Sequence, residues 1–325
     1  MTTDERLTVL LLTDPGMSGH AWPGHPERPE RIAPVVAGTA EAALAAGAEL
    51  VRRTADPAPL ELLASVHDPQ YVGWLAAGVQ GSGGWFDADT YLVRASPRAA
   101  MLAAGLAVAA ALAAARGEAA VAFAAIRPPG HHAGSEGGKG FCILNNVAVA
   151  VAALRAARAA ERVAVLDWDV HHGDGSEALF ADDQDVFYAS THQYPWYPGT
   201  GSSFDQGETL LNVPLAAGSG DDEFIAAWQE TILPRIGAFA PDAILVSAGY
   251  DAHRSDPLAG LEVTERGYGE VARAVGRVAR EADLGGVAAA LEGGYDLDAL
   301  RASSAATVTG LLSGLARPPN GERGN

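Results

Sequence analysis

The segment Val163-Ala164-Val165-Leu166-Asp167-Trp168-Asp169-Val170-His171-His172 passes directly from an apolar run to polar side chains. Ala243–Asp251 and Val287–Tyr295 repeat this pattern, and Arg127–His132 follows a fourth apolar run. Short apolar runs of this kind are typical of buried strands. In an open parallel sheet, ligands bind beyond the carboxyl ends of the strands. The sequence therefore predicts that these polar residues meet at one edge of a sheet.

Such apolar runs alternate with longer helical patterns along the chain, which is typical of α/β folds with a mostly parallel sheet. The predicted strands are Leu7–Leu12, Ala119–Ile126, Arg162–Trp168, Asp185–Ser190, Ala243–Ser247 and Gly286–Leu291. The predicted helices are Pro34–Ala46, Pro97–Ala115, Asn146–Ala160, Asp221–Phe239, Thr264–Ala282 and Leu297–Leu312. Long loops in a compact domain usually shape a site. Four turn-rich segments are expected at this edge, namely Pro15–Pro29, Gly78–Thr90, Arg127–Gly140 and Tyr194–Gly207.

The composition is that of a globular protein. The 325 residues are 48% hydrophobic, which suffices for a large core in one large domain or two small ones. A net charge of −18 disfavours nucleic acid and anionic membranes as partners. Cys142 is the only cysteine, Met1–Arg6 is unlike a signal peptide, and Ala99–Ala115 suits a buried helix better than a membrane span. We expect a soluble, cytoplasmic protein.

Three of the polar residues at the predicted strand ends suit a metal ion. Asp169 and His171 are two residues apart, so in an extended segment their side chains point the same way. Asp251 adds a second carboxylate, and the three ligands suit Zn²⁺ and equally Fe²⁺ or Co²⁺. One such triplet alone could merely cap a turn. Three matching strand ends and a pair of adjacent histidines favour a metal-dependent hydrolase instead.

Several motifs in this chain occur in the order found in a known family. They are Arg127–His132 with Gly140–Cys142, Asp167–Gly175, Pro198–Gly201, Ser247–Asp251 and Leu291–Tyr295. From about Gly19 to Leu312 the chain resembles the zinc-dependent histone deacetylase family. That superfamily includes acetylpolyamine amidohydrolases and bacterial acetoin-utilisation deacetylases, and the last two motifs resemble its class II and bacterial branches.

The resemblance implies an arginase/deacetylase fold. This fold is a single α/β domain with a central, mostly parallel sheet of about eight strands flanked by helices. We assign residues 1–316 to this catalytic domain. Residues 317–325 are rich in Pro, Gly and charge, and we predict that they form a disordered tail.

The resemblance also implies a role for each site residue. Zinc would be held by Asp169, His171 and Asp251. His132 would be the general base and acid, His131 its electrostatic partner, and Tyr295 the donor to the oxyanion, while Asp174 and Asp167 would hydrogen-bond His132 and His131, respectively. The walls of a narrow acyl-lysine channel would include Phe141, Tyr197, Gly140 and Leu258. A structural potassium ion would be held by Asp167, Asp169, His171 and Ser190, partly through main-chain carbonyls.

Each of these groups supplies something that amide hydrolysis requires. Zinc lowers the pKa of a bound water to about 7, which supplies a nucleophile at neutral pH. A histidine titrates in the range required to accept the proton of that water and pass it to the leaving amine. A carboxylate partner fixes the tautomer of the histidine, and a phenol donates where negative charge develops. The predicted activity is removal of an acyl group, most simply acetyl, from a lysine-like or other primary amine.

Three alternatives remain open at this stage. The substrate could be an acetylpolyamine or small amide. Leu258 stands where polyamine-selective relatives carry a glutamate, although Glu27, Glu136 or Asp87 could read a distal ammonium instead. An arginase-like ureohydrolase would need a carboxylate at Gly173 for a second metal ion. A catalytically idle acyl-lysine binding protein would not need His132 and Tyr295.

Other features carry no firm prediction. The superfamily often assembles through loops near the site, so a homo-oligomer is possible. Cys142 is expected to be a buried structural thiol. Arg28 and Arg31 resemble the family's N-terminal active-site loop, but helix capping or ion pairing explains them equally well. The roles of the remaining loop histidines are left open, and these are His20, His25, His192 and His253.

Overall fold

The computed structural model describes residues 7–78 and 83–317. Its centre is an eight-stranded, all-parallel sheet with the order β2-β1-β5-β10-β9-β6-β7-β8. The strands are β1 (Thr8–Leu12), β2 (Glu49–Arg53), β5 (Val121–Ala124), β6 (Val163–Asp167), β7 (Val186–Gln193), β8 (Leu210–Leu215), β9 (Ala243–Ala248) and β10 (Val287–Leu291). The predicted single α/β domain with a sheet of about eight strands is confirmed. The predicted disordered tail lies outside the described residues from position 318 onward.

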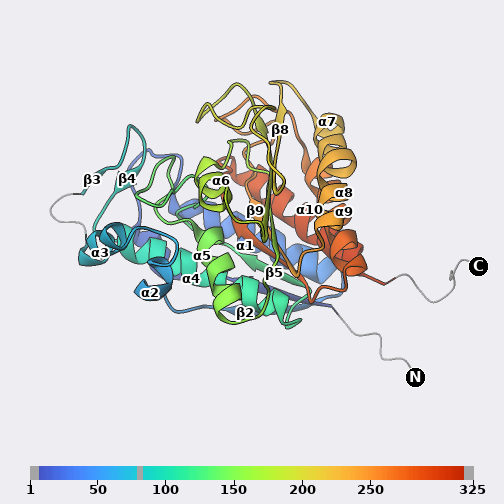
Figure 1. Cartoon of the computed structure of the whole chain (residues 1–325), viewed down its shortest axis with the longest axis horizontal. Coiled ribbons are helices and arrows are strands. Elements are labelled where there is room, and N and C mark those ends of the chain that lie inside the picture. Colours follow the sequence, from blue (N-terminus) through green and yellow to red (C-terminus); the bar gives the residue numbers. More distant parts are fainter. Residues whose placement is uncertain (1–6, 79–82, 318–325) are drawn as a thin grey trace, which may run out of the picture.

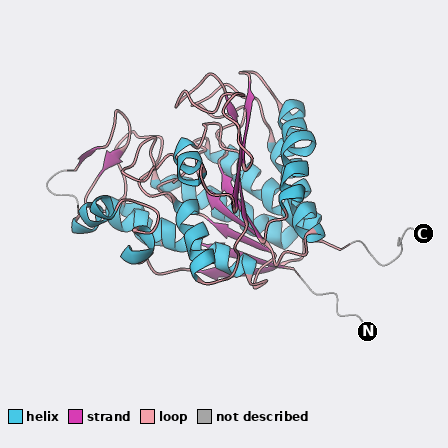
Figure 2. Ribbon diagram, in the orientation of Figure 1, coloured by secondary structure: helices cyan, strands magenta, loops and turns pink. Residues whose placement is uncertain are grey.

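Helices cover both faces of the sheet (Figure 2). The major helices are α1 (Ile32–Ala45), α4 (Ser96–Ala115), α5 (Asn146–Ala156), α9 (Glu265–Glu281) and α10 (Leu297–Leu315). Helices α1, α9 and α10 pack together, and α4 packs against α5. The predicted helix at residues 221–239 is α7 (Asp221–Ala226), a π-helical segment (Ala227–Ile232) and α8 (Leu233–Phe239). Because apolar side chains cover both faces of the central strands, these strands are buried at every position.

Helix α4 is long and apolar enough to cross a membrane by length and composition alone. However, 67% of its most apolar window is buried inside the domain. Its alanines and leucines pack against α5 and the strands β10 and β5. The prediction that this segment is a buried core helix is therefore confirmed.

Shorter elements lie outside the central sheet. They are α2 (Leu60–Leu63), α3 (Pro69–Ala77), α6 (Asp174–Phe180) and the two-stranded hairpin β3 (Gly84–Trp85) and β4 (Tyr91–Leu92). The hairpin projects from the body of the domain beside α3 (Figure 1). None of these elements was predicted, because each is too short to show a repeating apolar pattern.

Candidate metal centre and active site

Four neighbouring central strands deliver the predicted site residues to one edge. Strand β6 precedes Asp169 and His171, and its neighbour β9 precedes Asp251. Their ligand atoms all lie within 4.8 Å of one another. His171 Nδ1 is 3.1 Å from Asp169 Oδ1 and 3.2 Å from Asp251 Oδ2. We call these three residues the metal-ligand cluster.

The metal-ligand cluster has the properties of a cation site. Both carboxylates are buried, and Asp251 Oδ2 has no hydrogen-bond donor within the described chain. Burial and the charge of Asp169 raise the pKa of Asp251. Burial opposes protonation of His171, but the neighbouring carboxylates of Asp169 and Asp251 raise the pKa of its imidazole to about 10. The cluster thus attracts a proton or another cation, and two oxygens with one nitrogen suit a divalent transition ion.

Two glycines make room for these carboxylates. A Cβ atom on Gly249 would lie 2.2 Å from Asp169 Oδ2, and one on Gly293 would lie 2.0 Å from Asp251 Oδ2. Gly293 N also donates a hydrogen bond of 2.7 Å to Asp169 Oδ2. Any larger residue at these two positions would displace a proposed ligand, so the glycines in both motifs are explained by space at the metal-ligand cluster.

The adjacent histidines follow β5, and each pairs with a different carboxylate. His132 Nδ1 lies 2.9 Å from Asp174 Oδ1, and His131 Nδ1 lies 3.1 Å from Asp167 Oδ2. Burial and the charge of His131 lower the pKa of His132 to about 3. Burial opposes protonation of His131, but the charges of Asp169 and Asp167 raise its pKa well above the usual value. A neutral His132 that donates from Nδ1 to Asp174 leaves Nε2 free to accept a proton.

Tyr295 lies at the end of the loop that follows β10. Gly294 precedes it with a φ of 112°, a conformation that glycine adopts readily. The guanidinium of Arg31 lies 4.8 Å from the centre of the tyrosine ring, and Arg31 Nε donates to Gly294 O at 2.6 Å. Burial raises the pKa of Tyr295 well above its usual value, so its hydroxyl remains a neutral donor. Phe141 packs edge-on against this ring at 5.7 Å.

Asp256 holds Tyr295 from the other side. Its Oδ2 accepts hydrogen bonds from Tyr295 N at 2.6 Å and Asp296 N at 3.3 Å, and its Oδ1 accepts from Leu258 N at 3.1 Å. Burial and the charge of Asp251 raise the pKa of Asp256 to about 7. This positioning contact was not predicted from the sequence. The only sequence signal was an aspartate shortly after Asp251.

The expected channel residues lie beside the histidines. Tyr197 packs edge-on against His132 at 5.1 Å and His171 at 6.0 Å. A Cβ atom on Gly140 would lie 2.5 Å from His132 Cδ2, so only glycine leaves this wall open. Tyr197 thus lies against the imidazoles of His132 and His171, and Phe141 lies against the ring of Tyr295. Leu258 is half-buried, and its carbonyl accepts a hydrogen bond of 3.2 Å from Trp196.

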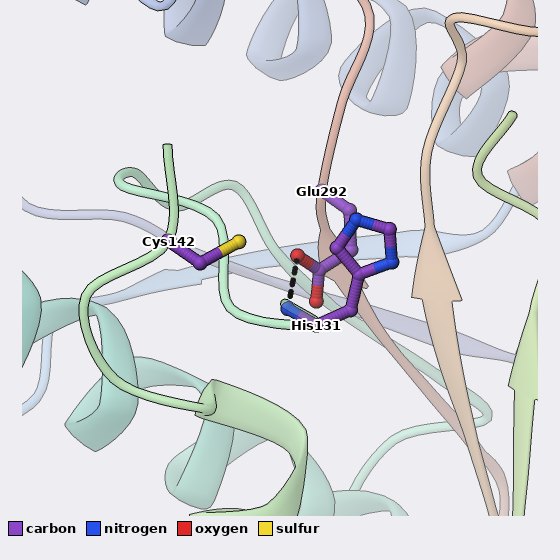
Figure 3. A group of neighbouring side chains, drawn as sticks. All are labelled: His131, Cys142 and Glu292. Carbon is purple, nitrogen blue, oxygen red and sulfur yellow. Dashed lines mark hydrogen bonds between the residues drawn. The ribbon is translucent and has the colours of Figure 1, made fainter. Parts of the chain in front are cut away.

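A second group of possible ligand atoms lies beneath the loop of the adjacent histidines. His131, Cys142 and Glu292 form this group, and all are buried (Figure 3). Glu292 Oε2 accepts hydrogen bonds from Gly130 N at 2.6 Å and His131 N at 3.1 Å. Burial raises the pKa of Glu292 to about 7, and burial also raises that of the Cys142 thiol. Because Glu292 ties this loop to the strand end before Tyr295, the group is a structural link between the two loops.

A third buried cluster, the Glu27 cluster, consists of Glu27, Arg31 and Arg127. Glu27 Oε1 accepts from Arg127 Nε at 2.8 Å and Arg31 Nη1 at 3.2 Å, and Glu27 Oε2 accepts from Arg127 Nη2 at 2.6 Å. The suggestion that Glu27 could read a substrate ammonium is therefore wrong, because its carboxylate is fully buried and paired. Asp87 is also occupied by protein partners, since its carboxylate accepts hydrogen bonds from Thr90 N at 2.6 Å and Gly140 N at 3.1 Å. Glu136 is exposed.

The four loop histidines all have protein partners. His20 lies 2.7 Å from Ser96 Oγ, His25 lies 2.9 Å from Asp89 O, His192 lies 2.7 Å from Gly201 O, and His253 Nδ1 accepts a hydrogen bond of 3.1 Å from Ser255 N. His192 also lies 2.8 Å from Ser190 Oγ. These contacts favour structural roles. Ser190 stands opposite Asp167 in the register of β6 and β7, which brings together two of the residues suggested for potassium.

The fold and this arrangement of carboxylates, imidazoles and a phenol define a hydrolase-type centre. A family model described as the histone deacetylase domain matches residues 25–311. A probable deacetylase of Archaeoglobus fulgidus is 39% identical over 297 residues, which cover 90% of this chain and 82% of that protein. Histone deacetylase 15 of Arabidopsis thaliana is 38% identical over 89% of this chain, but the match spans only 53% of the plant protein.

A solved structure of an acetylpolyamine aminohydrolase from Burkholderia pseudomallei superposes with a TM-score of 0.80 and 31% identity. The superposition covers 93% of this chain and 98% of that one. The chain belongs to the histone deacetylase family. It is therefore a deacetylase, a hydrolase of the amide bond in an acetylated substrate, and the family implies a metal cofactor.

Proposed function

We propose that this protein uses one zinc ion to remove an acetyl group from a lysine-like or other primary amine. The observation that carries the proposal is the metal-ligand cluster, whose three ligand atoms converge while Asp251 Oδ2 lacks a donor. Iron(II) and cobalt(II) suit the same ligands. When bound, the ion supplies a Lewis acid that acidifies water and polarises the substrate carbonyl.

The remaining steps belong to the protein's own groups. Nε2 of His132 takes a proton from water and later delivers it to the leaving amine, while Asp174 keeps the imidazole in the required tautomer. His131 contributes positive charge beside this centre. Tyr295 donates its hydroxyl proton in a hydrogen bond to the carbonyl oxygen as negative charge develops. Phe141 and Tyr197 hold the acyl-bearing chain and exclude water.

Two observations weigh against the alternatives. A Cβ atom at Gly173 would lie 2.3 Å from Asp167 Oδ2, so the site offers no room for the extra carboxylate of a two-metal ureohydrolase. Glu27 and Asp87 are paired within the protein, so only the exposed Glu136 of the three suggested carboxylates is available to read a distal ammonium, which weighs against an acetylpolyamine. The net charge of −18 also supports a cationic or neutral amine substrate rather than nucleic acid.

We further propose a structural potassium ion at Asp167, Asp169, His171 and Ser190, which is supported by the register that sets Ser190 opposite Asp167 on adjacent strands. Its contribution can be measured as a rise in melting temperature when K⁺ replaces Na⁺. An equal melting temperature in both salts would argue against this second ion.

The function is tested by screening metal-free and zinc-loaded protein against acetyl-lysine peptides, acetylpolyamines and small amides. We expect chelator-sensitive release of acetate from acetyl-lysine peptides, with one zinc ion per chain. A preference for acetylpolyamines would correct the substrate class. Binding of acetyl-lysine without turnover would indicate a catalytically idle acyl-lysine binding protein.

A further inference from the structure

The only lysine in the sequence, Lys139, lies in the active-site loop, and every other basic side chain with a permanent charge is arginine. Lys139 stands between the adjacent histidines and the channel residue Phe141. Its carbonyl accepts a hydrogen bond of 2.9 Å from Cys142 N. The intervening Gly140 and Phe141 have φ angles of 55° and 68°, which form a tight turn. The main chain of Lys139 is thus fixed beside the site.

The ammonium of Lys139 forms an ion pair with Asp174 Oδ2. The other oxygen, Asp174 Oδ1, lies 2.9 Å from His132 Nδ1. The side chain of Asp174 is only 12% exposed, whereas that of Lys139 is 43% exposed. One carboxylate therefore bridges an ammonium on the solvent side and an imidazole on the inner side.

Lysine and arginine would act differently at this position. An ammonium is a compact charge that can bind one carboxylate oxygen, whereas a guanidinium is a planar fork that tends to bind both. Arginine would compete with His132 for Oδ1 of Asp174. Lysine leaves that oxygen to the imidazole, which gives a physical reason for a lysine here in a chain that otherwise uses arginine.

We propose that Lys139 is a positioning residue that fixes the rotation of the Asp174 carboxylate and thereby the imidazole of His132. This inference rests on the proposed function, because the orientation of His132 matters only if it accepts a proton from the nucleophile. Outer partners that orient groups at metal sites typically affect activity by about 10–100-fold. Burial opposes ionisation of Asp174, but the hydrogen bonds and charges of His132 and, to a smaller extent, of Lys139 hold its pKa down at about 2.

The first test compares Lys139→Met with the wild type and with Arg53→Met. Arg53 is a matched control, because it is 52% exposed and paired with Glu118 at 3.1 Å, away from the site. We expect Lys139→Met to lower kcat about 10-fold with little change in KM, melting temperature or zinc content. An unchanged kcat, or a loss confined to KM or matched by lost stability, would overturn the inference. If the wild type shows no turnover, the proposed function fails instead.

A second test uses the fact that the folded chain has one ε-amino group. Reductive dimethylation keeps its positive charge, whereas carbamoylation by cyanate removes it. We expect the dimethylated wild type to retain kcat, and the carbamoylated protein to match Lys139→Met. The same reagents on Lys139→Met should cause no further loss, because only the α-amino group remains. Equal losses after both treatments would contradict a role for the charge.

Discussion

The metal-ligand cluster and the Glu27 cluster are both buried, but carboxylates outnumber basic side chains in the first and guanidiniums outnumber carboxylates in the second. In the Glu27 cluster, one carboxylate meets two guanidiniums and each of its oxygens is paired. In the metal-ligand cluster, two carboxylates meet one imidazole and one oxygen has no donor. Buried charges are tolerated only when they are compensated. The comparison indicates that the Glu27 cluster is complete within the protein, whereas the metal-ligand cluster is completed by a cation.

The two clusters meet at the loop that carries Tyr295. Arg31, a member of the Glu27 cluster, contacts the tyrosine ring and the carbonyl of Glu292. Gly293 in the same loop donates to Asp169. A structural ion cluster thus supports one side of the loop, and the proposed metal ligands support the other. Changes to the two clusters should therefore have different consequences, which the following variants separate.

The largest effect is expected when the metal-ligand cluster loses a carboxylate. Asp251→Ala should abolish zinc binding and turnover, because two ligands cannot hold the ion in competition with solvent. Zinc content after dialysis, measured by plasma mass spectrometry, checks this. Full occupancy in the variant would assign the third ligand to another residue, with Asp256 the first candidate to test.

A change in the Glu27 cluster should lower folding stability rather than zinc binding. Glu27→Gln leaves two buried guanidiniums without a counter-charge, which typically costs about 3–5 kcal/mol of folding stability. Urea unfolding with and without bound zinc measures this loss. Zinc stoichiometry in the folded fraction should remain that of the wild type. A fully stable variant would contradict the assigned balance of charges.

The same cluster predicts a pH dependence. Burial raises the pKa of Glu27, but Arg127, His20 and Arg31 outweigh it and hold that pKa below its usual value. The unfolded state therefore binds the proton more readily, so the stabilisation is present above the unfolded pKa of about 4.3 and is lost as the pH falls. Urea unfolding from pH 7 to 3 should show this slope in the wild type. A slope of equal size in Glu27→Gln would assign it to other carboxylates.

A smaller, purely catalytic effect is expected where the two clusters meet. Tyr295→Phe removes the donor to the oxyanion and should lower turnover about 10²–10³-fold, with zinc content and stability retained.

His132→Ala should lower turnover by at least about 10²-fold for lack of the base. Steady-state kinetics beside metal analysis separates these variants from Asp251→Ala. Turnover near that of the wild type would contradict the catalytic role proposed for the substituted residue.

The smallest effect is expected at the surface. Arg53→Met removes an exposed ion pair with Glu118, and such pairs contribute at most about 1 kcal/mol. Its stability and kinetics should match those of the wild type within error. A large effect would show that surface charge influences the site over a long range.

The sequence predicted the central strands well because they are apolar over their whole length. The edge strands β2 and β8 were missed. Strand β2 carries Glu49, Arg52 and Arg53, and β8 contains Pro214, so neither has a continuous apolar run. A strand at the sheet edge needs less apolar surface and can accommodate proline. Short elements such as α6 could not be separated from loops for the same lack of pattern.

The site was predicted as far as its residues follow strand ends. The pairs His132–Asp174 and His131–Asp167, and the convergence of the metal-ligand cluster, followed from the family motifs. The contacts of Asp256, Glu292 and Arg31 with the Tyr295 loop did not. These contacts depend on how distant segments pack, and single positions in a sequence carry little signal for such packing.

The most direct test locates the ion by anomalous diffraction at the zinc edge in crystals of the zinc-loaded protein. The account predicts a single catalytic peak about 2.0–2.2 Å from ligand atoms of Asp169, His171 and Asp251. A pair of peaks about 3.5–4 Å apart, or a peak bound by other residues, would contradict it.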